Sequence, residues 1–392
     1  MRVLLLNRYS LERTAGGVAE YLYYLPLSLK PLGITTYIYN EDEKGGSQLV
    51  GPRLLKNGVP TYAGPFIKPS FFVSTKKLNP LLELCKKEKI DLIHAQGTYR
   101  CGWIAMQVCK LAKIPYVVTS HADIVVTNSD RMKRGKVQRR ARAVLAHAAK
   151  VTHLTPLMAE ISHQVFDTRD KSYIIGNGID VKEWRAVATL PEQNYAIGIG
   201  RLEPEKGFHV LISAYALLHS QNFSGSLVIA GTGSAELELQ HQAKRLGMNV
   251  VTAFQDFSRV PERSVVFTGY IRGEIKKQLI GQSQMILFPT QPQQWEEPFG
   301  IVQIEAMAAG KALIASDSVT TRYLQTFGLQ AALVQAENVH AWAEEIKNIS
   351  VNQVVRHQLG RKNLENADQF DWSVIAKQYR DVYLAVGKRR DI

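Results

Sequence analysis

The sequence predicts an α/β protein built from two parallel-sheet domains in tandem. Short apolar segments alternate with helical patterns along most of the 392 residues, which is typical of strands joined by covering helices. The alternation is interrupted by a polar stretch at residues 184–194. The chain is also longer than one hydrophobic core usually supports. We therefore expect a first domain at residues 1–184 and a second at residues 195–373.

Each expected domain contains six candidate strands. In the first domain they lie at residues 3–6, 36–39, 92–94, 116–119, 151–154 and 173–175. In the second domain they lie at residues 196–200, 227–230, 265–268, 285–288, 313–315 and 332–334. Helical patterns in the first half cover residues 18–29, 81–87 and 103–111. Open parallel sheets bind ligands at the carboxyl ends of their strands, so we expect the two domains to face a central cleft.

Composition indicates a globular chain, with 45% hydrophobic and 21% charged residues. No apolar run approaches the eighteen residues of a membrane span. The run at residues 3–6 is too short for the core of a signal peptide. The three cysteines, Cys85, Cys101 and Cys109, lack metal-ligand spacing and fit free thiols. These features favour a cytoplasmic location.

The net charge of +13 is partly concentrated in residues 131–142, which include seven basic residues and no acidic one. The basic residues are Arg131, Lys133, Arg134, Lys136, Arg139, Arg140 and Arg142. A solvated helix face would account for them. The functional alternatives are an anionic acceptor or an anionic membrane surface, which could hold the protein at the inner face of the membrane. No aromatic residues of the kind that stack bases are interleaved, so we expect no nucleic-acid partner.

Two loops of the first domain carry candidate binding residues. Gly16 and Gly17 open a helix after the first strand, and paired glycines allow the backbone to approach a phosphate closely. An ordinary turn would use the same residues. His121 follows the fourth strand, where it could donate to a sugar hydroxyl or simply be hydrogen-bonded within the domain.

In the second domain, Arg201 and Lys206 lie between a strand and a helix. A bidentate guanidinium and an ammonium group together suit a diphosphate. Two further strand exits could approach a nucleotide. They contain Gly231 and Gly233, which suit a phosphate or nucleoside, and Tyr270 and Ile271, whose backbone could pair with a base edge.

The segment from Glu297 to Glu305 predicts a loop followed by a helix that starts near Gly300 and stops at Gly310. Free backbone amides at Gly300 and Ile301 would form a positive helix terminus, where anions or sugar oxygens can bind. Glu305 would lie within the helix on a face that can turn to the same pocket. The alternative is an ordinary surface helix with two solvated glutamates.

Together these motifs resemble the retaining glycosyltransferases of the GT-B architecture, specifically family 4, also called group 1. The resemblance covers nearly the whole chain. It implies two Rossmann-like domains and a last helix that crosses back onto the first domain. The segment from Phe370 to Trp372 resembles the bend before that helix, so residues 374–392 are assigned to the first domain.

The resemblance also implies roles for matching positions. Arg201 and Lys206 would bind the donor diphosphate, and Glu305 would hold the ribose hydroxyls. Glu297 would hold the donor sugar together with backbone amides around Phe299, Gly300 and Ile301. His121 would contact a sugar hydroxyl near the reacting carbon. The remaining donor-binding positions are Gly16, Gly17, Gly231, Gly233, Tyr270 and Ile271.

We therefore expect retaining, metal-independent transfer of a sugar from a UDP- or GDP-sugar to a hydroxyl acceptor. A glycan or lipid-linked cell-envelope precursor is the expected acceptor, and no cofactor or metal ligand is expected. The absence of an Asp-x-Asp pair counts against a metal-dependent, single-domain transferase. The alternatives are a nucleotide-sugar epimerase of the same fold and a non-catalytic binding protein. Residues 317–322 depart from the family pattern, which usually has a glycine pair there.

Overall fold

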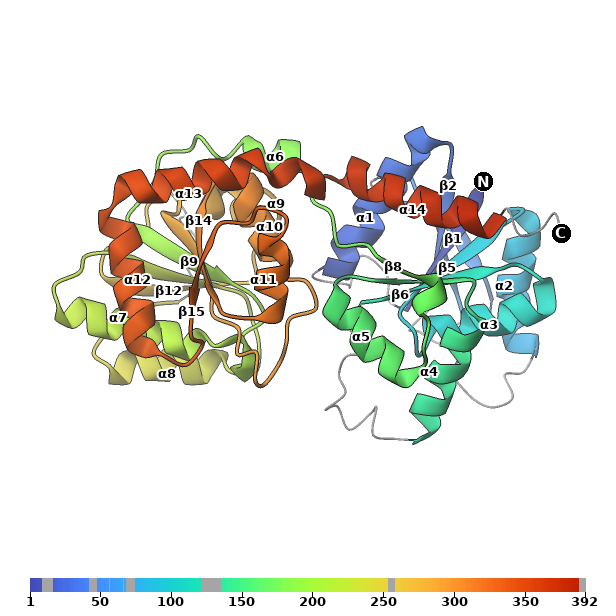
Figure 1. Ribbon diagram of the computed structural model, residues 1–392, viewed down its shortest axis with the longest axis horizontal. Helices are drawn as coiled ribbons and strands as arrows, with labels where there is room; N and C mark the ends of the chain where they lie inside the picture. The colour runs from blue at the N-terminus through green and yellow to red at the C-terminus, as the bar shows by residue number, and fades with distance from the viewer. Residues whose placement is uncertain are drawn as a thin grey trace. The chain divides into compact units, whose positions relative to one another are not determined.

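The computed structural model describes residues 1–8, 17–41, 48–55, 57–65, 67, 75–121, 135–252 and 258–387. The chain divides into two compact units. The first consists of Met1–Ile179 with Trp372–Ile392, and the second of Asp180–Asp371. Each unit contains its own sheet with helices on both faces (Figure 1). These are the two Rossmann-like parallel-sheet domains that the sequence predicts.

The first unit contains an eight-stranded sheet whose strands are parallel except for β3, which pairs antiparallel with β4. In spatial order the strands are β3 (Val50–Leu54), β4 (Pro60–Gly64), β2 (Thr35–Glu41), β1 (Arg2–Asn7), β5 (Leu92–Gln96), β6 (Tyr116–Ser120), β7 (Lys150–His153) and β8 (Ser172–Ile174). The sequence did not indicate β3 or β4. Every residue of β3 is exposed, so this edge strand has no alternation of apolar and polar residues to reveal it.

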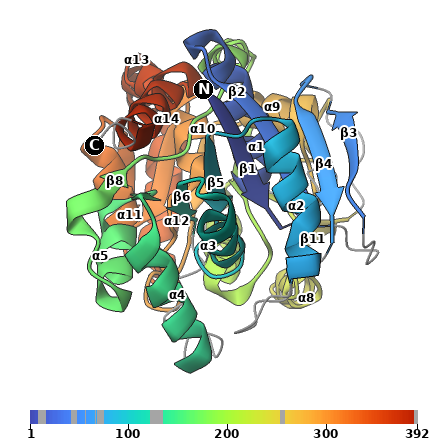
Figure 2. The same ribbon diagram turned by 90° about the vertical axis from the view of Figure 1, so that its right-hand side faces the viewer.

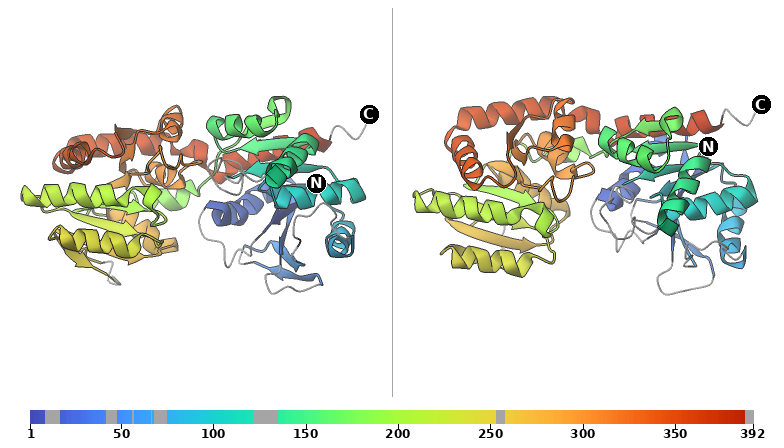
Figure 3. Two further views of the ribbon diagram at one scale, coloured as in Figure 1. Left: turned by 90° about the horizontal axis from the view of Figure 1, so that it is seen from below. Right: turned by 60° about the horizontal axis from the view of Figure 1, so that its bottom comes forward.

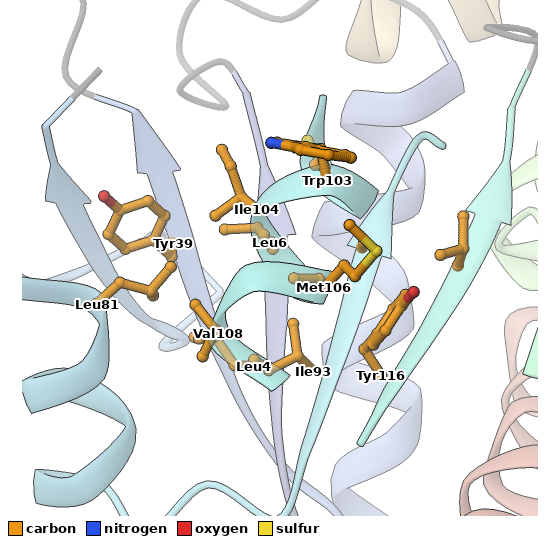
Figure 4. Packing of buried hydrophobic residues seen from close by; sticks show 14 of the residues in the cluster. Leu4, Leu6, Tyr39, Leu81, Ile93, Trp103, Ile104, Met106, Val108 and Tyr116 are labelled. Atoms are coloured by element: carbon orange, nitrogen blue, oxygen red, sulfur yellow. The ribbon is translucent and has the colours of Figure 1, made fainter. Parts of the chain in front are cut away.

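Helices cover both faces of this sheet. They are α1 (Gly17–Leu29), α2 (Thr75–Lys87), α3 (Cys101–Ala112), α4 (Gly135–His147), α5 (Pro156–Val165) and α14 (Trp372–Gly387). Helices α2, α3 and α4 pack on one face, and Figure 2 shows α3 and α4 in front of the strands. Figure 4 shows Leu4 and Leu6 of β1 beside Ile104 and Val108 of α3. Helices α1 and α14 cover the other face.

The last helix, α14, belongs to the first unit, as the sequence predicts. It lies beside α1 (Figure 1) and begins at Trp372, whose amide donates to the carbonyl oxygen of Ile179 at 3.1 Å. The Trp372 ring is stacked on Tyr24 with ring centroids 6.2 Å apart and meets the Tyr21 ring edge-on. Trp372 is buried, so the return of the chain is fixed by aromatic packing.

The second unit contains a seven-stranded, all-parallel sheet. In spatial order the strands are β11 (Asn249–Val251), β12 (Ser264–Gly269), β10 (Ser226–Ala230), β9 (Tyr195–Ile199), β13 (Met285–Phe288), β14 (Ala312–Ser316) and β15 (Ala331–Val334). Five of the seven include nearly continuous buried apolar runs, which is typical of strands covered on both faces. The short edge strand β11 was not predicted.

Helices also lie on both faces of the second sheet. They are α6 (Val181–Arg185), α7 (Phe208–Ser220), α8 (Glu236–Arg245), α9 (Gly273–Gln282), α10 (Ile301–Ala308), α11 (Val319–Gln325), α12 (Val339–Val351) and α13 (Gln353–Glu365). Helices α7, α8 and α12 share one hydrophobic cluster with the strands. On the other side of the sheet, α10 contacts both α6 and α13 (Figures 1 and 3).

The unit boundaries differ from the expected ones. The first segment ends at Ile179 rather than residue 184, the second unit begins at Asp180 rather than residue 195, and the chain returns to the first unit at Trp372 rather than residue 374. Helix α6 belongs to the second unit because it packs against α10. Its Trp184 side chain is buried, whereas the sequence suggested that a linker begins at this residue. At the other end, α14 begins two positions before residue 374, at Trp372.

Three further sequence expectations concern the described residues. None of their helices combines the length and apolar character needed to cross a membrane. Cys85, Cys101 and Cys109 are free thiols, as predicted. Within the described part of the chain, no cluster of three or more metal-ligating side chains is found.

Replacing Trp372 with alanine should destabilise the first unit by about 3–5 kcal/mol, because it removes a large buried ring and leaves a cavity. The measurement is urea unfolding followed by circular dichroism. Leu384→Ala is the matched control, since Leu384 lies on the same helix and is 47% exposed. Equal losses in the two variants would show that the Trp372 packing does not anchor the helix.

Candidate functional site

The candidate site of the second unit lies where the strand order reverses. Strand β9 pairs with β10 on one side and with β13 on the other. The chain leaves β9 towards α7 and leaves β13 towards α10. Because all three strands are parallel, both exits lie at the same carboxyl edge of the sheet. Such a switch point is where open α/β sheets bind their ligands.

The exit from β9 carries Arg201 and Lys206. A short 3-10 helix, η3 (Pro204–Lys206), ends at Gly207, which has a φ of 73°. A Cβ atom on Gly207 would lie 2.0 Å from the carbonyl oxygen of Pro289, so the loops after β9 and β13 pack together closely here. The contact is continued by the Gln291 amide, which donates to the carbonyl oxygen of Glu205 at 2.8 Å.

This packing brings Lys206 and Glu297 into an ion pair. The Lys206 side chain is only 11% exposed, and its Nζ lies 5.9 Å from the centre of the Trp295 ring. Arg201 is different, because its side chain is 63% exposed and lies 3.8 Å from the Glu205 carboxylate. Both predicted cations therefore pair with a glutamate, but only Arg201 is exposed enough to be accessible to a ligand.

Helix α10 is the helix that the sequence predicts between Gly300 and Gly310. Gly300 precedes it with a φ of 72°, and Gly310 follows it with a φ of 61°. The first amides of a helix have no intrahelical partner, so Ile301 begins a helix end suited to oxygen ligands. The preceding Phe299 side chain is buried and meets the Phe370 ring edge-on, which fixes this turn.

Glu305 is buried on α10 and pairs with a residue that the sequence did not indicate. Its Oε1 accepts from Lys276 Nζ of α9 at 2.5 Å, whereas its buried Oε2 has no hydrogen-bond partner within the described residues. The Trp184 ring lies 5.6 Å from the same ammonium group. A buried hydrogen-bond acceptor without a partner is costly, so a hydrogen-bond donor of a ligand would be favoured beside Oε2.

The glycine loop after β10 packs against the loop that carries Arg201. A Cβ atom on Gly231 would lie 1.8 Å from the carbonyl oxygen of Gly200, and one on Gly233 would lie 2.3 Å from that of Leu202. Both glycines are therefore required for the close approach of these loops. The adjacent Ser234 amide donates to Glu203 at 3.3 Å, and hydrogen bonds from Ser234 lower the pKa of the Glu203 carboxyl.

The two predicted binding residues at the exit from β12 differ in exposure. Tyr270 is 56% exposed, whereas Ile271 is buried. They precede α9, the helix that carries Lys276. The exposed Tyr270 and its neighbouring backbone are therefore presented at the same carboxyl edge as the loops described above.

In the first unit, His121 immediately follows β6 and bonds to Gln96 at the end of β5. The distance from His121 Nε2 to Gln96 Oε1 is 2.7 Å, and the imidazole meets the Tyr21 ring edge-on. Burial lowers the pKa of His121 to about 4, so the ring is neutral at pH 7. Gly17 begins α1, while Gly16 lies outside the described residues.

The basic cluster is described in part. Helix α4 buries Val137 and Ala141 and exposes Lys136, Arg139 and Arg142, the pattern of an amphipathic helix. Arg140 is instead used within the unit: its Nη1 donates to Tyr99 Oη at 3.3 Å, and its guanidinium lies over the Trp103 ring. The other three members, Arg131, Lys133 and Arg134, lie outside the described residues.

The positive charge of the whole chain lies in the first unit. This unit contains 31 Lys and Arg residues against 15 Asp and Glu residues, a net charge of +16. The second unit contains 17 against 20, a net charge of −3. The basic cluster is therefore part of a charge difference between the two units.

Sequence reasoning missed three polar or aromatic residues that support these sites: Lys276, Trp184 and Gln96. Gln96 could have been noticed, because it ends the strand beside the one that His121 follows. Lys276 and Trp184 gave no such signal. They lie far from Glu305 in sequence and reach it only because α6, α9 and α10 lie close together in the fold.

Comparison with known proteins gives two family matches that follow one another along the chain. Residues 15–183 match the model described as Glycosyltransferase Family 4. Residues 180–365 match the model described as Glycosyl transferases group 1. A similar curated protein is the D-inositol 3-phosphate glycosyltransferase of Corynebacterium glutamicum. It is 24% identical over 331 residues, covering 77% of this chain and 74% of the relative.

Solved structures with a similar fold cover almost the whole chain. Sucrose-phosphate synthase from Thermosynechococcus elongatus has a TM-score of 0.76 at 20% identity, with 99% of each chain covered. Anabaena HepE, in complex with UDP-glucose, has a TM-score of 0.72 at 19% identity, with 98% of this chain and 100% of that chain covered. Likeness at this level of identity shows the shared two-domain fold.

Gly207→Ala should destabilise the second unit by roughly 2–4 kcal/mol, because left-handed backbone strain adds to a clash with the Pro289 carbonyl. Gly247→Ala is the matched control, with the same φ of 73° but no atom within 4 Å of the added Cβ. It should cost about 1–2 kcal/mol. Urea unfolding measures both. Equal costs would mean that the contact between the two loops is not tight.

Proposed function

The chain belongs to the group 1 glycosyltransferases of the family 4 type, and we propose that it transfers a sugar from UDP or GDP to a hydroxyl acceptor with retention and without a metal. The observation that carries the proposal is the meeting of Lys206 and Glu297 at the switch point of the second sheet. Nucleotide-sugar donors are the substrates expected for this enzyme class.

Arg201 and Lys206 bind the donor diphosphate in this proposal. Arg201 is exposed and offers two parallel hydrogen bonds, whereas Lys206 offers a point charge from a fixed position. Departure of a nucleoside diphosphate develops negative charge on its terminal phosphate. Lys206 is already held in place and stabilises that charge without the cost of reorganisation, and Arg201 adds a second positive charge. Gly17, Gly231 and Gly233 provide the close backbone approach near the phosphates, with Gly16 as the fourth expected position.

Glu305 holds the ribose of the donor. Its Oε2 is the buried acceptor without a partner, and two neighbouring ribose hydroxyls are donors of suitable chemistry. Lys276 fixes the other carboxylate oxygen, so Glu305 can accept without rotating. The backbone at Tyr270 and Ile271 pairs with the base edge.

Glu297 and the start of α10 hold the donor sugar. The carboxylate accepts from a sugar hydroxyl, and amides around Phe299, Gly300 and Ile301 donate to sugar oxygens. His121 contacts another hydroxyl of this sugar. Its low pKa supports a neutral hydrogen-bonding role, since an imidazole that is neutral at pH 7 has both a donor and an acceptor nitrogen.

The proposed reaction exchanges one bond to the anomeric carbon for another. The bond to the diphosphate oxygen breaks, and a bond to the acceptor hydroxyl oxygen forms on the same face of the sugar. The hydroxyl proton passes to an oxygen of the leaving diphosphate. Arg201 and Lys206 stabilise the negative charge that develops on the diphosphate as its bond to the sugar breaks and before the proton arrives, which favours departure of the leaving group.

The acceptor is proposed to be anionic, as a glycan or lipid-linked precursor of the cell envelope. This proposal rests on the net charge of +16 in the first unit and on the exposed side chains of Lys136, Arg139 and Arg142. We further propose that the enzyme works in the cytoplasm at the inner face of the membrane, where the same residues would meet anionic lipid headgroups.

Arg201→Ala and Lys206→Ala should each lower turnover by about 100-fold to 1,000-fold, because each removes a charge that stabilises the leaving group. The assay is release of nucleoside diphosphate from UDP- and GDP-sugars, with and without acceptor extracts. Lys244→Ala is the control, since Lys244 is exposed on α8.

Three other results of this assay would count against the proposal. Wild-type turnover in both variants would refute the diphosphate assignment. Isomerisation of the donor without an acceptor would indicate an epimerase. Failure of every nucleotide to bind would indicate that the protein is not a nucleotide-sugar enzyme.

Changing Lys136, Arg139 and Arg142 together to glutamate should weaken binding to anionic vesicles by at least about 100-fold, from roughly 1 kcal/mol for each basic residue. Co-sedimentation with phosphatidylglycerol and phosphatidylcholine vesicles at low and high salt measures this. The control changes Lys86, Lys87 and Lys89, which are also exposed in the first unit. Wild-type binding that is insensitive to salt or lipid charge would contradict the proposal.

A further inference from the structure

Thr320, near the start of α11, hydrogen-bonds to two consecutive glutamates. Its backbone amide donates to Glu296 Oε1 at 3.0 Å, and its Oγ1 donates to the carbonyl oxygen of Glu297 at 2.6 Å. Thr320 is fully buried, so its amide and hydroxyl both need a partner within the protein. One residue therefore fixes the side chain of Glu296 and the backbone of Glu297.

The start of α11 explains why Glu296 takes this position. Ser318 caps the helix, and its Oγ accepts from the Thr321 amide at 3.1 Å. The Thr320 amide would otherwise be one of the unpaired donors at the start of a helix. A carboxylate is favoured there by both the hydrogen bond and the helix dipole.

Hydrogen bonds at the start of α11 hold the Glu296 carboxyl in this position. Burial raises the pKa of its carboxyl, and hydrogen bonds from Thr320 and Ser318 oppose that rise. The neighbouring Glu297 carboxylate also disfavours a second negative charge. The donors at the start of α11 therefore offset part of the cost of burying the Glu296 carboxyl.

We propose that Thr320 and Glu296 form a clamp that positions Glu297 for the donor sugar, an inference that rests on the proposed function. The clamp anchors residues 296–297 to α11 at two adjacent points, while the Glu297 side chain reaches Lys206. Thr320 and Glu296 are positioning residues, because each acts through Glu297. The clamp requires a hydroxyl at position 320, which the glycine pair usual in this loop would not supply.

If Thr320 and Glu296 served only to cap α11, their loss would have a different effect. Loss of such a cap would lower stability and affect all ligands alike. Loss of the clamp would weaken the binding of the sugar and leave the proposed contact of Glu305 with the nucleotide intact. The two roles are therefore separated by comparing a nucleotide with its sugar derivative.

The test uses Thr320→Val, which removes the hydroxyl but keeps the amide, and Thr320→Ser, which keeps both. Thr326→Val is the matched control, because Thr326 Oγ1 donates to the Tyr323 carbonyl oxygen at 2.6 Å in the same helix region. Calorimetry measures affinity for UDP, UDP-glucose, GDP and GDP-mannose. Donor kcat and KM are measured with whichever sugar nucleotide the wild type uses.

We expect Thr320→Val to lower kcat/KM for the donor by about 10-fold or more, the effect of losing one well-placed hydrogen bond. Thr320→Ser should restore kcat/KM. In Thr320→Val, the affinity for the free nucleoside diphosphate should stay within about twofold of the wild-type value, well below the tenfold change that 1.4 kcal/mol represents. Glu296→Gln, which weakens the bond to the Thr320 amide, should have a smaller effect of the same kind.

The clamp is overturned if Thr320→Val leaves both donor kcat/KM and sugar-nucleotide affinity unchanged. It is also overturned if this variant loses nucleotide and sugar nucleotide affinity in equal proportion. Failure of the proposed function looks different, because the wild type itself would then bind or transfer no sugar nucleotide. In a wild type that binds but does not transfer, the affinity difference between UDP-glucose and UDP still reports on the clamp.

Discussion

The parallel pairing of β9 with β13 is the constraint on which the candidate donor site depends. It places the ends of two strands that are distant in sequence at one edge of the sheet. Their loops then pack so closely that Gly207 has no room for a side chain. Lys206 and Glu297 meet because of this packing, although 90 residues separate them in the chain.

Charged residues at this edge form ion pairs, but some of their atoms remain available for a ligand. Lys206 is paired with Glu297, and Lys276 with Glu305, in partly or fully desolvated positions. Desolvation makes each charge dependent on its partner, so the side chains have little freedom to move. Arg201 and Glu305 Oε2 remain available for a ligand. A site arranged in this way is largely formed before a ligand arrives, which lowers the cost of binding.

Much of the fold was predictable because buried parallel strands leave a strong apolar signal. All six strands expected in each domain are present, and α10 lies between the two glycines that the sequence indicates. The edge strands β3 and β11 were missed because edge strands are short or exposed and lack that signal. That the predicted site residues bind a nucleotide-sugar donor remains a prediction.

The supporting residues could not be predicted, for a physical reason. Lys276, Trp184 and Thr320 act through contacts that exist only once helices from different parts of the chain have packed. Their residue types are common on helices, and nothing in their immediate sequence distinguishes them. Arg140 illustrates the converse, because it belongs to a basic cluster in sequence but is bound to Tyr99 and Trp103 in the structure.

The charge difference between the two units bears on how the proposed substrates are distinguished. Both a nucleotide sugar and the proposed acceptor are anionic, yet the second unit has a net charge of −3 and the first of +16. A negatively charged unit binds a diphosphate through cations and backbone amides gathered at one point, which suits a small ligand of defined shape. A broadly positive unit attracts anionic surfaces at long range and with less geometric demand. The distribution of charge thus favours a small, locally bound donor on the second unit and an extended anionic acceptor on the first.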